Sequence, residues 1–218
     1  VAPPDAPPGP TLCVHTRPLA FASWADKYER GESLVPSQHV QVPPRAWPPE
    51  LKCRSRMHYY LADREANAIE PGARAILLDE AGFVCETTTA NVLAYFRGEG
   101  IVSPRHEKIL PGVSAATIGE LASTLGIGQS ERDLTLADMG GADEILMTST
   151  SPCVLPVVRF ASRPVGDGRP GPIYRKLLAA WGQEVGVDIA TQAAQFAARR
   201  AGSATGDTSG VPADPTAP

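Results

Sequence analysis

The feature that most constrains the fold is a series of short apolar segments, each closed by turn residues, between residues 74 and 160. Short apolar runs bounded by Gly, Pro or Asp are typical of strands. Glycine-containing turns at residues 80–82 and 98–100 separate neighbouring runs. The expected strands are Arg74–Asp79, Phe83–Glu86, Asn91–Phe96, 127–132, Asp143–Thr148 and Val154–Phe160.

Helices are expected in three places around these strands. The first begins near Met57 and stops at Pro71-Gly72, and the second runs from Ser114, as N-cap, to Gly126. The third covers about 172–186. Five prolines within residues 33–51 exclude a long helix there. Mixed short strands with a few helices indicate an α+β domain rather than a regular βαβ array.

Composition narrows the class of function. The formal net charge is −4 and no run of Lys or Arg occurs, so a nucleic-acid or anionic-membrane surface is not expected. No segment approaches the roughly 18 apolar residues of a membrane helix. The four cysteines lie far apart with no C-x-x-C pair and the four histidines form no H-x-x-x-H motif. We therefore expect reduced thiols, a cytoplasmic protein and no metal site.

The two ends of the chain differ from its centre. Residues 1–10 contain five prolines and are expected to form an extended lead. Residues 11–21 alternate weakly and are expected to form a strand, whereas residues 196–218 are expected to be a disordered tail. The chain starts with Val1 rather than Met, which indicates a processed protein or a fragment.

Several of these elements are followed by side chains that can carry chemistry. Lys52 lies between Leu51 and Cys53, where partial desolvation would lower its pKa and favour nucleophilic attack, although most such lysines are solvated. Glu86 ends a strand and, without further information, is an exposed charge. The run Leu110–Ser114 opens a helix, and Thr148-Ser149-Thr150 closes another strand.

In their order and spacing these segments resemble the class IV aminotransferases, the pyridoxal-phosphate enzymes of fold type IV. That family includes branched-chain and D-amino acid aminotransferases and aminodeoxychorismate lyase. The resemblance runs from about Thr11 to Trp181. The matching strings are Leu51-Lys52, Arg64-Glu65-Ala66, Leu78-Asp79, Gly82-Phe83-Val84-Cys85-Glu86, Ala90-Asn91-Val92, Ile109-Leu110-Pro111-Gly112-Val113-Ser114, Ala142-Asp143-Glu144, Thr148-Ser149-Thr150 and Leu155-Pro156-Val157.

The resemblance implies a cofactor, pyridoxal 5′-phosphate, and a role for individual residues. Lys52 would be the Schiff-base lysine and would move a proton as general acid and base. Glu86 would face the pyridine nitrogen and keep the ring protonated. Val113 and Ser114 would bind the phosphate through backbone N–H groups at a helix start.

Three further residues are candidates for the same site. Thr150 would add a hydroxyl to the phosphate, with Ser149 as its neighbour. Arg45 would add positive charge near the phosphate, although an exposed arginine is an equal alternative. Two departures from the family pattern stand nearby, because Ala115 replaces an Arg and Met57 stands where branched-chain enzymes hold a Tyr.

The resemblance also implies a domain organisation. Residues 31–195 would form the cofactor-binding large domain, a mixed β pseudo-barrel flanked by helices. Residues 11–30 would be the last strands of a small N-terminal domain that is otherwise largely absent. Because the family is dimeric, a homodimer is expected.

Three functions remain open at this point. The first is a transaminase that moves an amino group between an amino acid, with the branched-chain type favoured, and a 2-oxo acid. The second is a lyase of the aminodeoxychorismate type that releases pyruvate. The third is a truncated, non-catalytic remnant. The stereochemistry of the substrate, L or D, also stays open.

Overall fold

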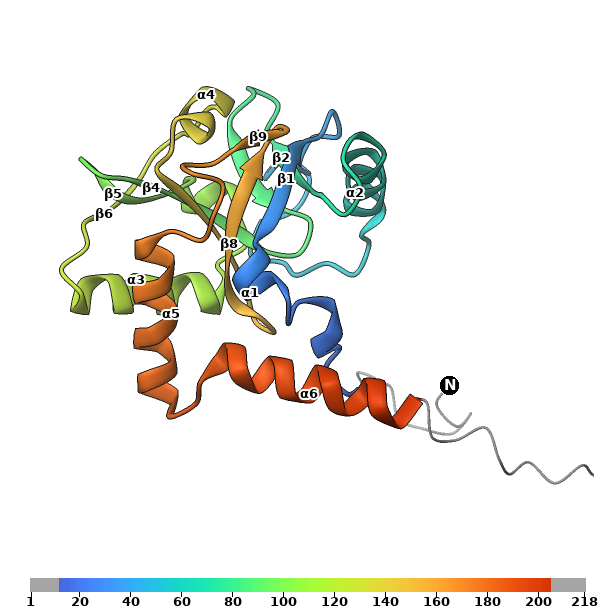
Figure 1. The fold of residues 1–218 in the computed structure, drawn as a ribbon. Helices are drawn as coiled ribbons and strands as arrows, with labels where there is room; N and C mark the ends of the chain where they lie inside the picture. Colours follow the sequence, from blue (N-terminus) through green and yellow to red (C-terminus); the bar gives the residue numbers. More distant parts are fainter. Residues whose placement is uncertain (1–11, 205–218) are drawn as a thin grey trace, which may run out of the picture.

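The computed structural model describes residues 12–204, and its architecture is α+β, as predicted. Nine strands form one sheet (Figure 1). The strands are β1 (Glu32–Pro36), β2 (Arg74–Leu78), β3 (Val84–Thr87), β4 (Asn91–Phe96), β5 (Gly100–Ser103), β6 (Gln129–Glu131), β7 (Glu144–Ser149), β8 (Cys153–Phe160) and β9 (Arg163–Pro164). Each expected strand from residue 74 onward is therefore present, with ends shifted by at most two residues.

Six of these strands close into a barrel in the order β3-β2-β1-β8-β7-β4. Closure comes from a further pairing of β3 with β4, in which Glu86 lies opposite Asn91. β1 runs parallel to both β2 and β8, whereas β7 is antiparallel to β4 and β8. The result is the mixed β pseudo-barrel that the resemblance implied.

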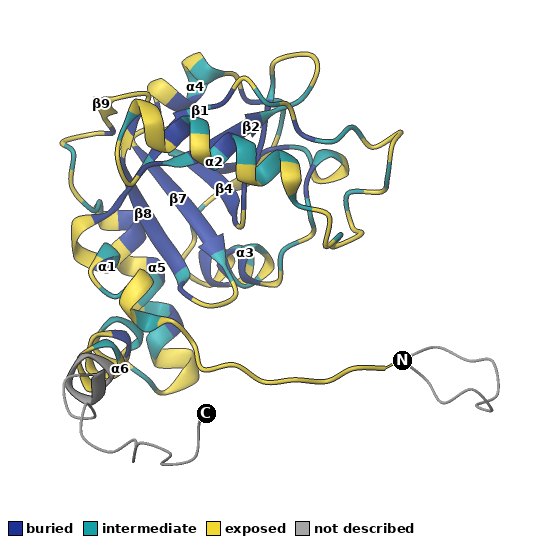
Figure 2. Ribbon diagram, turned by 90° about the vertical axis from the view of Figure 1, so that its right-hand side faces the viewer, coloured by how far each residue is buried: buried dark blue, intermediate teal, exposed yellow. Residues whose placement is uncertain are grey.

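Helices cover the barrel from outside (Figures 1 and 2). The elements are η1 (Phe21–Ser23), α1 (Lys27–Arg30), α2 (Met57–Ile69), η2 (His106–Lys108), α3 (Val113–Thr124), α4 (Leu136–Gly140), α5 (Pro172–Val185) and α6 (Ile189–Ala204). α2 packs on β1 and β2, and α3 and α5 pack on β7. The three expected helices are confirmed as α2, α3 and α5, while α4 and α6 were not predicted.

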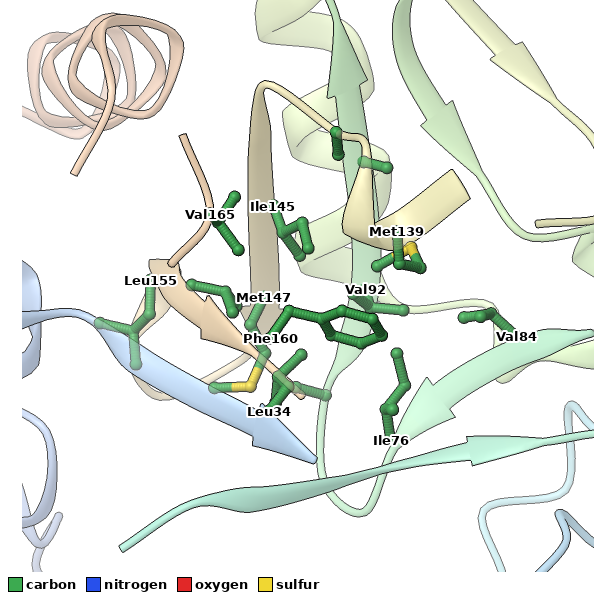
Figure 3. Close-up of a cluster of buried hydrophobic side chains, with 14 of the residues drawn as sticks. Leu34, Ile76, Val84, Val92, Met139, Ile145, Met147, Leu155, Phe160 and Val165 are labelled. Atoms are coloured by element: carbon green, nitrogen blue, oxygen red, sulfur yellow. The ribbon is translucent and has the colours of Figure 1, made fainter. Parts of the chain in front are cut away.

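Alternate residues of the same strands fill two different layers of the core. Ile145 and Met147 of β7 belong to the cluster drawn in Figure 3, whereas Leu146 between them packs with α3 and α5. Likewise Ile76 of β2 joins the first cluster, and its neighbours Ala75 and Leu77 pack with residues of α2. This alternation follows from the two-residue period of a strand. Burial on both faces explains why the strands appear in the sequence as continuous apolar runs.

The buried carboxylate of Glu144 caps helix α5 from strand β7. Its two oxygens accept the backbone N–H groups of Ile173 at 2.8 Å and Tyr174 at 2.9 Å, and the N-cap residue Gly171 supplies no side-chain bond of its own. We expect Glu144→Ala to lower the free energy of unfolding by about 1–3 kcal/mol in urea denaturation, because two donors lose their partner. The control Glu184→Ala removes an exposed carboxylate of the same helix and should change it by no more than about 0.5 kcal/mol. Equal effects of the two substitutions would contradict the capping role.

The predicted strand at residues 11–21 is wrong over its described part. Residues 12–20 form no strand, and Phe21 begins η1. Leu12 and Val14 are 87% and 81% exposed, so the weak alternation buries no apolar face, and Pro18 has no backbone N–H to donate to a ladder. Figure 2 shows this segment extended away from the barrel. The idea that residues 11–30 retain strands of a small domain is therefore not supported, since 21–30 hold only η1 and α1.

The expected disordered tail at residues 196–218 is also wrong in part, because α6 continues to Ala204. Asp188 accepts the backbone N–H of Thr191 at the start of this helix. Phe196 stacks on Phe21 with ring centroids 5.0 Å apart, which joins the two ends of the described chain. The Pro-rich lead 1–10 and residues 205–218 lie outside the described residues.

Among the described residues, every helix is too short or too polar to span a membrane.

Candidate active site

One cavity of about 330 Å³ collects nearly all the polar residues singled out in the sequence. Five segments line it: the loop after β1, the first turn of α2, the β3–β4 turn, the stretch from the end of η2 to the start of α3, and the end of β7. The predicted residues among its lining are Lys52, Glu86, Val113, Ser114, Ser149 and Thr150. The barrel closure at β3–β4 thus brings together residues that lie far apart in the chain.

Glu86 is a buried carboxylate in the wall of this cavity, with only 6% of its surface exposed. Its Oε1 accepts hydrogen bonds from Gln41 Nε2 at 2.6 Å and from the Tyr59 hydroxyl at 2.9 Å, and Oε2 accepts the Leu110 N–H at 3.3 Å. Burial raises the pKa of Glu86, and these three donors oppose the rise. Glu86 is therefore not the exposed strand-end charge that its residue type alone suggested.

Tyr59 is the phenol that contacts Glu86, and it is itself half-buried. Burial and the neighbouring Glu86 carboxylate raise the pKa of Tyr59 to about 12. The phenol therefore remains protonated at neutral pH and acts as a donor toward Glu86. Gln41 bonds to both groups, since its Nε2 also lies 3.2 Å from the Tyr59 oxygen.

Two lysines line the cavity, and their surroundings differ. Lys108 Nζ donates to Asp133 at 2.6 Å and to Asp79 at 2.7 Å. Burial opposes its charge, but these two carboxylates raise the pKa of Lys108, so its ammonium group stays protonated. Lys52 is exposed and forms no ion pair among the described residues. The expectation that Leu51 and Cys53 desolvate Lys52 is wrong, because Leu51 is itself 55% exposed.

Helix α3 presents its first turn to the cavity. Gly112 is the N-cap and provides no side-chain bond, so the N–H groups of Val113 and Ser114 lack intrahelical acceptors. The prediction that Ser114 is the N-cap is off by two positions. A Cβ on Gly112 would lie 1.9 Å from Asn91 Oδ1, so any other residue here would force the Asn91 amide to shift. Asn91 in turn donates to Leu110 O at 2.8 Å and holds this loop against β4.

The cavity also contains a buried hydroxyl with no partner. Thr148 Oγ1 on β7 makes no hydrogen bond among the described residues, although Thr148 is only 1% exposed. Since buried hydroxyls normally have a partner, this atom points to a polar ligand in the cavity. Ser149 is engaged differently, because its hydroxyl donates to Thr89 O at 3.1 Å.

Arg45 is the predicted site residue that the structure does not bring to the cavity. Its side chain is exposed and pairs in two places with the Glu80 carboxylate. This is the surface alternative considered for Arg45.

No cluster of metal-ligating side chains occurs within the described part of the chain.

Sequence reasoning missed Gln41, Thr148 and Lys108 as cavity residues. Gln41 lies in a Pro-rich loop with no periodic pattern, so nothing local signals its role. Thr148 could have been found, because it belongs to the Thr-Ser-Thr string that ends a buried strand. Lys108 directly precedes the Ile-Leu-Pro-Gly string, but only the structure shows its contacts with Asp79 and Asp133.

Comparisons with known proteins point to one family. The family model for amino-transferase class IV matches residues 2–160. Branched-chain-amino-acid aminotransferase-like protein 1 of Arabidopsis thaliana is 31% identical over 179 residues, which make up 79% of this chain and 32% of that protein.

Solved structures agree with the sequence comparison. The branched-chain amino acid aminotransferase of Escherichia coli matches 72% of this chain and 52% of its own with a TM-score of 0.68 at 27% identity. A second branched-chain amino acid aminotransferase, solved in complex with N-(5′-phosphopyridoxyl)-L-glutamate, matches 71% of this chain and 51% of its own, with a TM-score of 0.66 at 29% identity. The chain thus spans about a third of the Arabidopsis protein and about half of each solved enzyme.

Proposed function

Because the chain belongs to the class IV aminotransferases, we propose that its cavity binds pyridoxal 5′-phosphate and transfers an amino group between an amino acid and a 2-oxo acid. One observation carries this proposal. Three groups line the same cavity: the primary amine of Lys52, which forms no ion pair among the described residues, the buried carboxylate of Glu86, and the N-terminus of α3.

The residues present fit this cofactor. In the described part of the chain, the backbone N–H groups of Val113 and Ser114 have no helix-cap partner, so they can bind a phosphate, and the helix dipole also favours an anion there. The partnerless hydroxyl of Thr148 needs a polar neighbour. A protonated pyridine nitrogen finds an acceptor in Glu86. Thr150, exposed at the end of β7, is a further hydroxyl for the phosphate end.

When bound, pyridoxal phosphate supplies an electron sink for the carbon from which a proton leaves. The remaining steps belong to the chain. Lys52 would hold the cofactor through its amine, and the same amine, once free again, would move a proton to and from the substrate carbon. Glu86, held by Tyr59 and Gln41, offers a fixed negative charge to the ring nitrogen. Lys108 does not compete with Lys52 for the cofactor, because two carboxylates keep its ammonium group charged.

We further propose a branched-chain amino acid as the amino donor. Both solved enzymes are branched-chain amino acid aminotransferases, and the Arabidopsis relative is named as branched-chain aminotransferase-like. Apolar side chains also contribute to the cavity wall, among them Val42, Trp47 and Leu51. These surfaces would accept an aliphatic side chain by burying its methyl groups.

The decisive experiment is chemical labelling of the lysine. Borohydride reduction of the protein with pyridoxal phosphate should leave one pyridoxyl group on Lys52, identified by peptide mapping. A label on Lys27, Lys108 or Lys176 instead would contradict the proposal.

A yellow protein whose spectrum changes with leucine and returns with a 2-oxo acid would support transamination. Release of pyruvate without an amino acceptor would indicate the lyase, and a colourless protein the remnant.

Other expectations remain proposals. We propose residues 31–195 as the cofactor-binding domain, a homodimer as the assembled form and the cytoplasm as its location. Light scattering would measure the mass in solution, and a stable 23 kDa monomer would exclude the dimer.

A further inference from the structure

Arg56, next to the first turn of α2, has no assigned role and lies in the wall of the cavity. It is half-buried, and one hydrogen bond of its guanidinium is defined, from Nη2 to Thr88 O at 2.6 Å. The guanidinium carbon lies 5.1 Å from the centroid of the Tyr59 ring, which limits its movement. A guanidinium has five N–H donors, so several remain available for a ligand.

Arg56 forms no salt bridge with a carboxylate within the described residues, in contrast to Lys108 in the same cavity. The positive charge of Arg56 nevertheless affects neighbouring groups in the cavity. The pKa of His58 is lowered by burial and, to a smaller extent, by Arg56, and Arg56 also opposes the rise that burial causes in the pKa of Glu86. The other charged side chains that line the cavity are Lys52, Lys108, Glu50 and Glu86.

We propose that Arg56 binds a carboxylate group of the substrate, as the residue that recognises amino and 2-oxo acids in this cavity. Planar guanidinium and carboxylate groups match in a bidentate pair, and partial burial strengthens such a pair over an exposed one. A carboxylate is favoured over the cofactor phosphate because the latter has its own donors at the start of α3 and the end of β7. The inference deepens the proposed function and rests on it.

The test uses 4-methylvalerate, which has a carboxylate and a branched aliphatic chain but neither an amino nor a keto group. Its affinity is measured by calorimetry and by the fluorescence of Trp47, which lines the cavity, with and without pyridoxal phosphate. The uncharged 4-methylpentanamide and inorganic phosphate serve as comparison ligands. The variants are Arg56→Gln, Arg56→Lys and, as matched control, Arg54→Gln, which removes an exposed arginine outside the cavity.

We expect Arg56→Gln to weaken 4-methylvalerate binding at least tenfold, while binding of the amide and of inorganic phosphate stays within about twofold. Arg56→Lys should lie between, because it keeps the charge but loses the bidentate geometry. Arg54→Gln should match the unsubstituted protein. If a thermal scan shows that Arg56→Gln does not fold, the Arg56→Lys variant tests the proposal instead. We expect it to bind 4-methylvalerate at least threefold more weakly than the unsubstituted protein.

Several results would overturn the inference. They are no binding of 4-methylvalerate by the unsubstituted protein, an unchanged affinity in the Arg56 variants, or an equal loss in Arg54→Gln. A loss confined to inorganic phosphate or pyridoxal phosphate would assign Arg56 to the cofactor instead. Labelling of Lys52 reports the proposed function independently. A labelled Lys52 with unaffected carboxylate binding would therefore reject only the role of Arg56.

Discussion

Replacement of Lys52 by alanine is expected to abolish measurable transamination while leaving the fold intact. The amine carries the proton at the substrate carbon in the proposed mechanism, and general acid–base catalysis alone contributes about 10²- to 10⁴-fold. The loss should exceed this range because the attachment of the cofactor is lost as well. Because Lys52 is exposed, its truncation creates no cavity in the core. The free energy of unfolding should therefore change by no more than about 0.5 kcal/mol.

The measurement compares turnover with leucine and 2-oxoglutarate in Lys52→Ala and in Lys176→Ala, an exposed lysine of α5 outside the cavity. The second variant should retain full activity. Addition of methylamine should restore part of the rate of Lys52→Ala, since a free amine can accept the proton that the side chain no longer takes. Normal turnover in Lys52→Ala without added amine would refute the assignment.

Glu86→Gln should lower turnover by roughly 10- to 150-fold. The substitution keeps the shape of the side chain but removes its charge, and a charge-assisted contact with the ring nitrogen corresponds to about 1.5–3 kcal/mol. The cofactor should still attach to Lys52, so its absorbance serves as a second readout. Glu107→Gln, which alters an exposed carboxylate outside the cavity, is the matched control. Unchanged kinetics in Glu86→Gln would show that the carboxylate has no catalytic role.

The same substitution has a defined effect on stability in the protein without cofactor. Burial raises the pKa of Glu86 above its usual value of 4.5, so the folded state binds the proton more tightly than the unfolded state. Its contribution to stability is therefore complete below pH 4.5 and is lost as the pH rises through the raised pKa. Glu86→Gln does not titrate there, so its free energy of unfolding should rise relative to the unsubstituted protein from about pH 4 to pH 7. A constant difference across this range would contradict the raised pKa.

The local elements of this protein could be predicted because their signals are local. Pro71-Gly72 ends α2, and Gly186 ends α5 in the left-handed conformation that glycine favours, with φ of 68°. Strands such as β2 and β7 could be recognised because both of their faces are buried, which makes each of them a continuous apolar run. The predictions failed at residues 12–20, where apolar side chains such as Leu12 and Val14 are exposed, and at α6, where the helix contacts a distant residue through Phe196.

The sequence by itself determined six of the nine strands, three helices and the set of polar residues that the family resemblance identified around Lys52 and Glu86. The tertiary structure decided which of those residues meet. Gln41 reaches Glu86 across 45 positions and Tyr59 across 27, whereas Arg45 turns away to Glu80. Such contacts depend on how β3 closes the barrel against β4, and the backbone pattern of either strand alone carries no information about that closure. The exposure of Lys52, the burial of Glu86 and the absence of a salt bridge to Arg56 among the described residues follow from this packing and not from their neighbours in the chain.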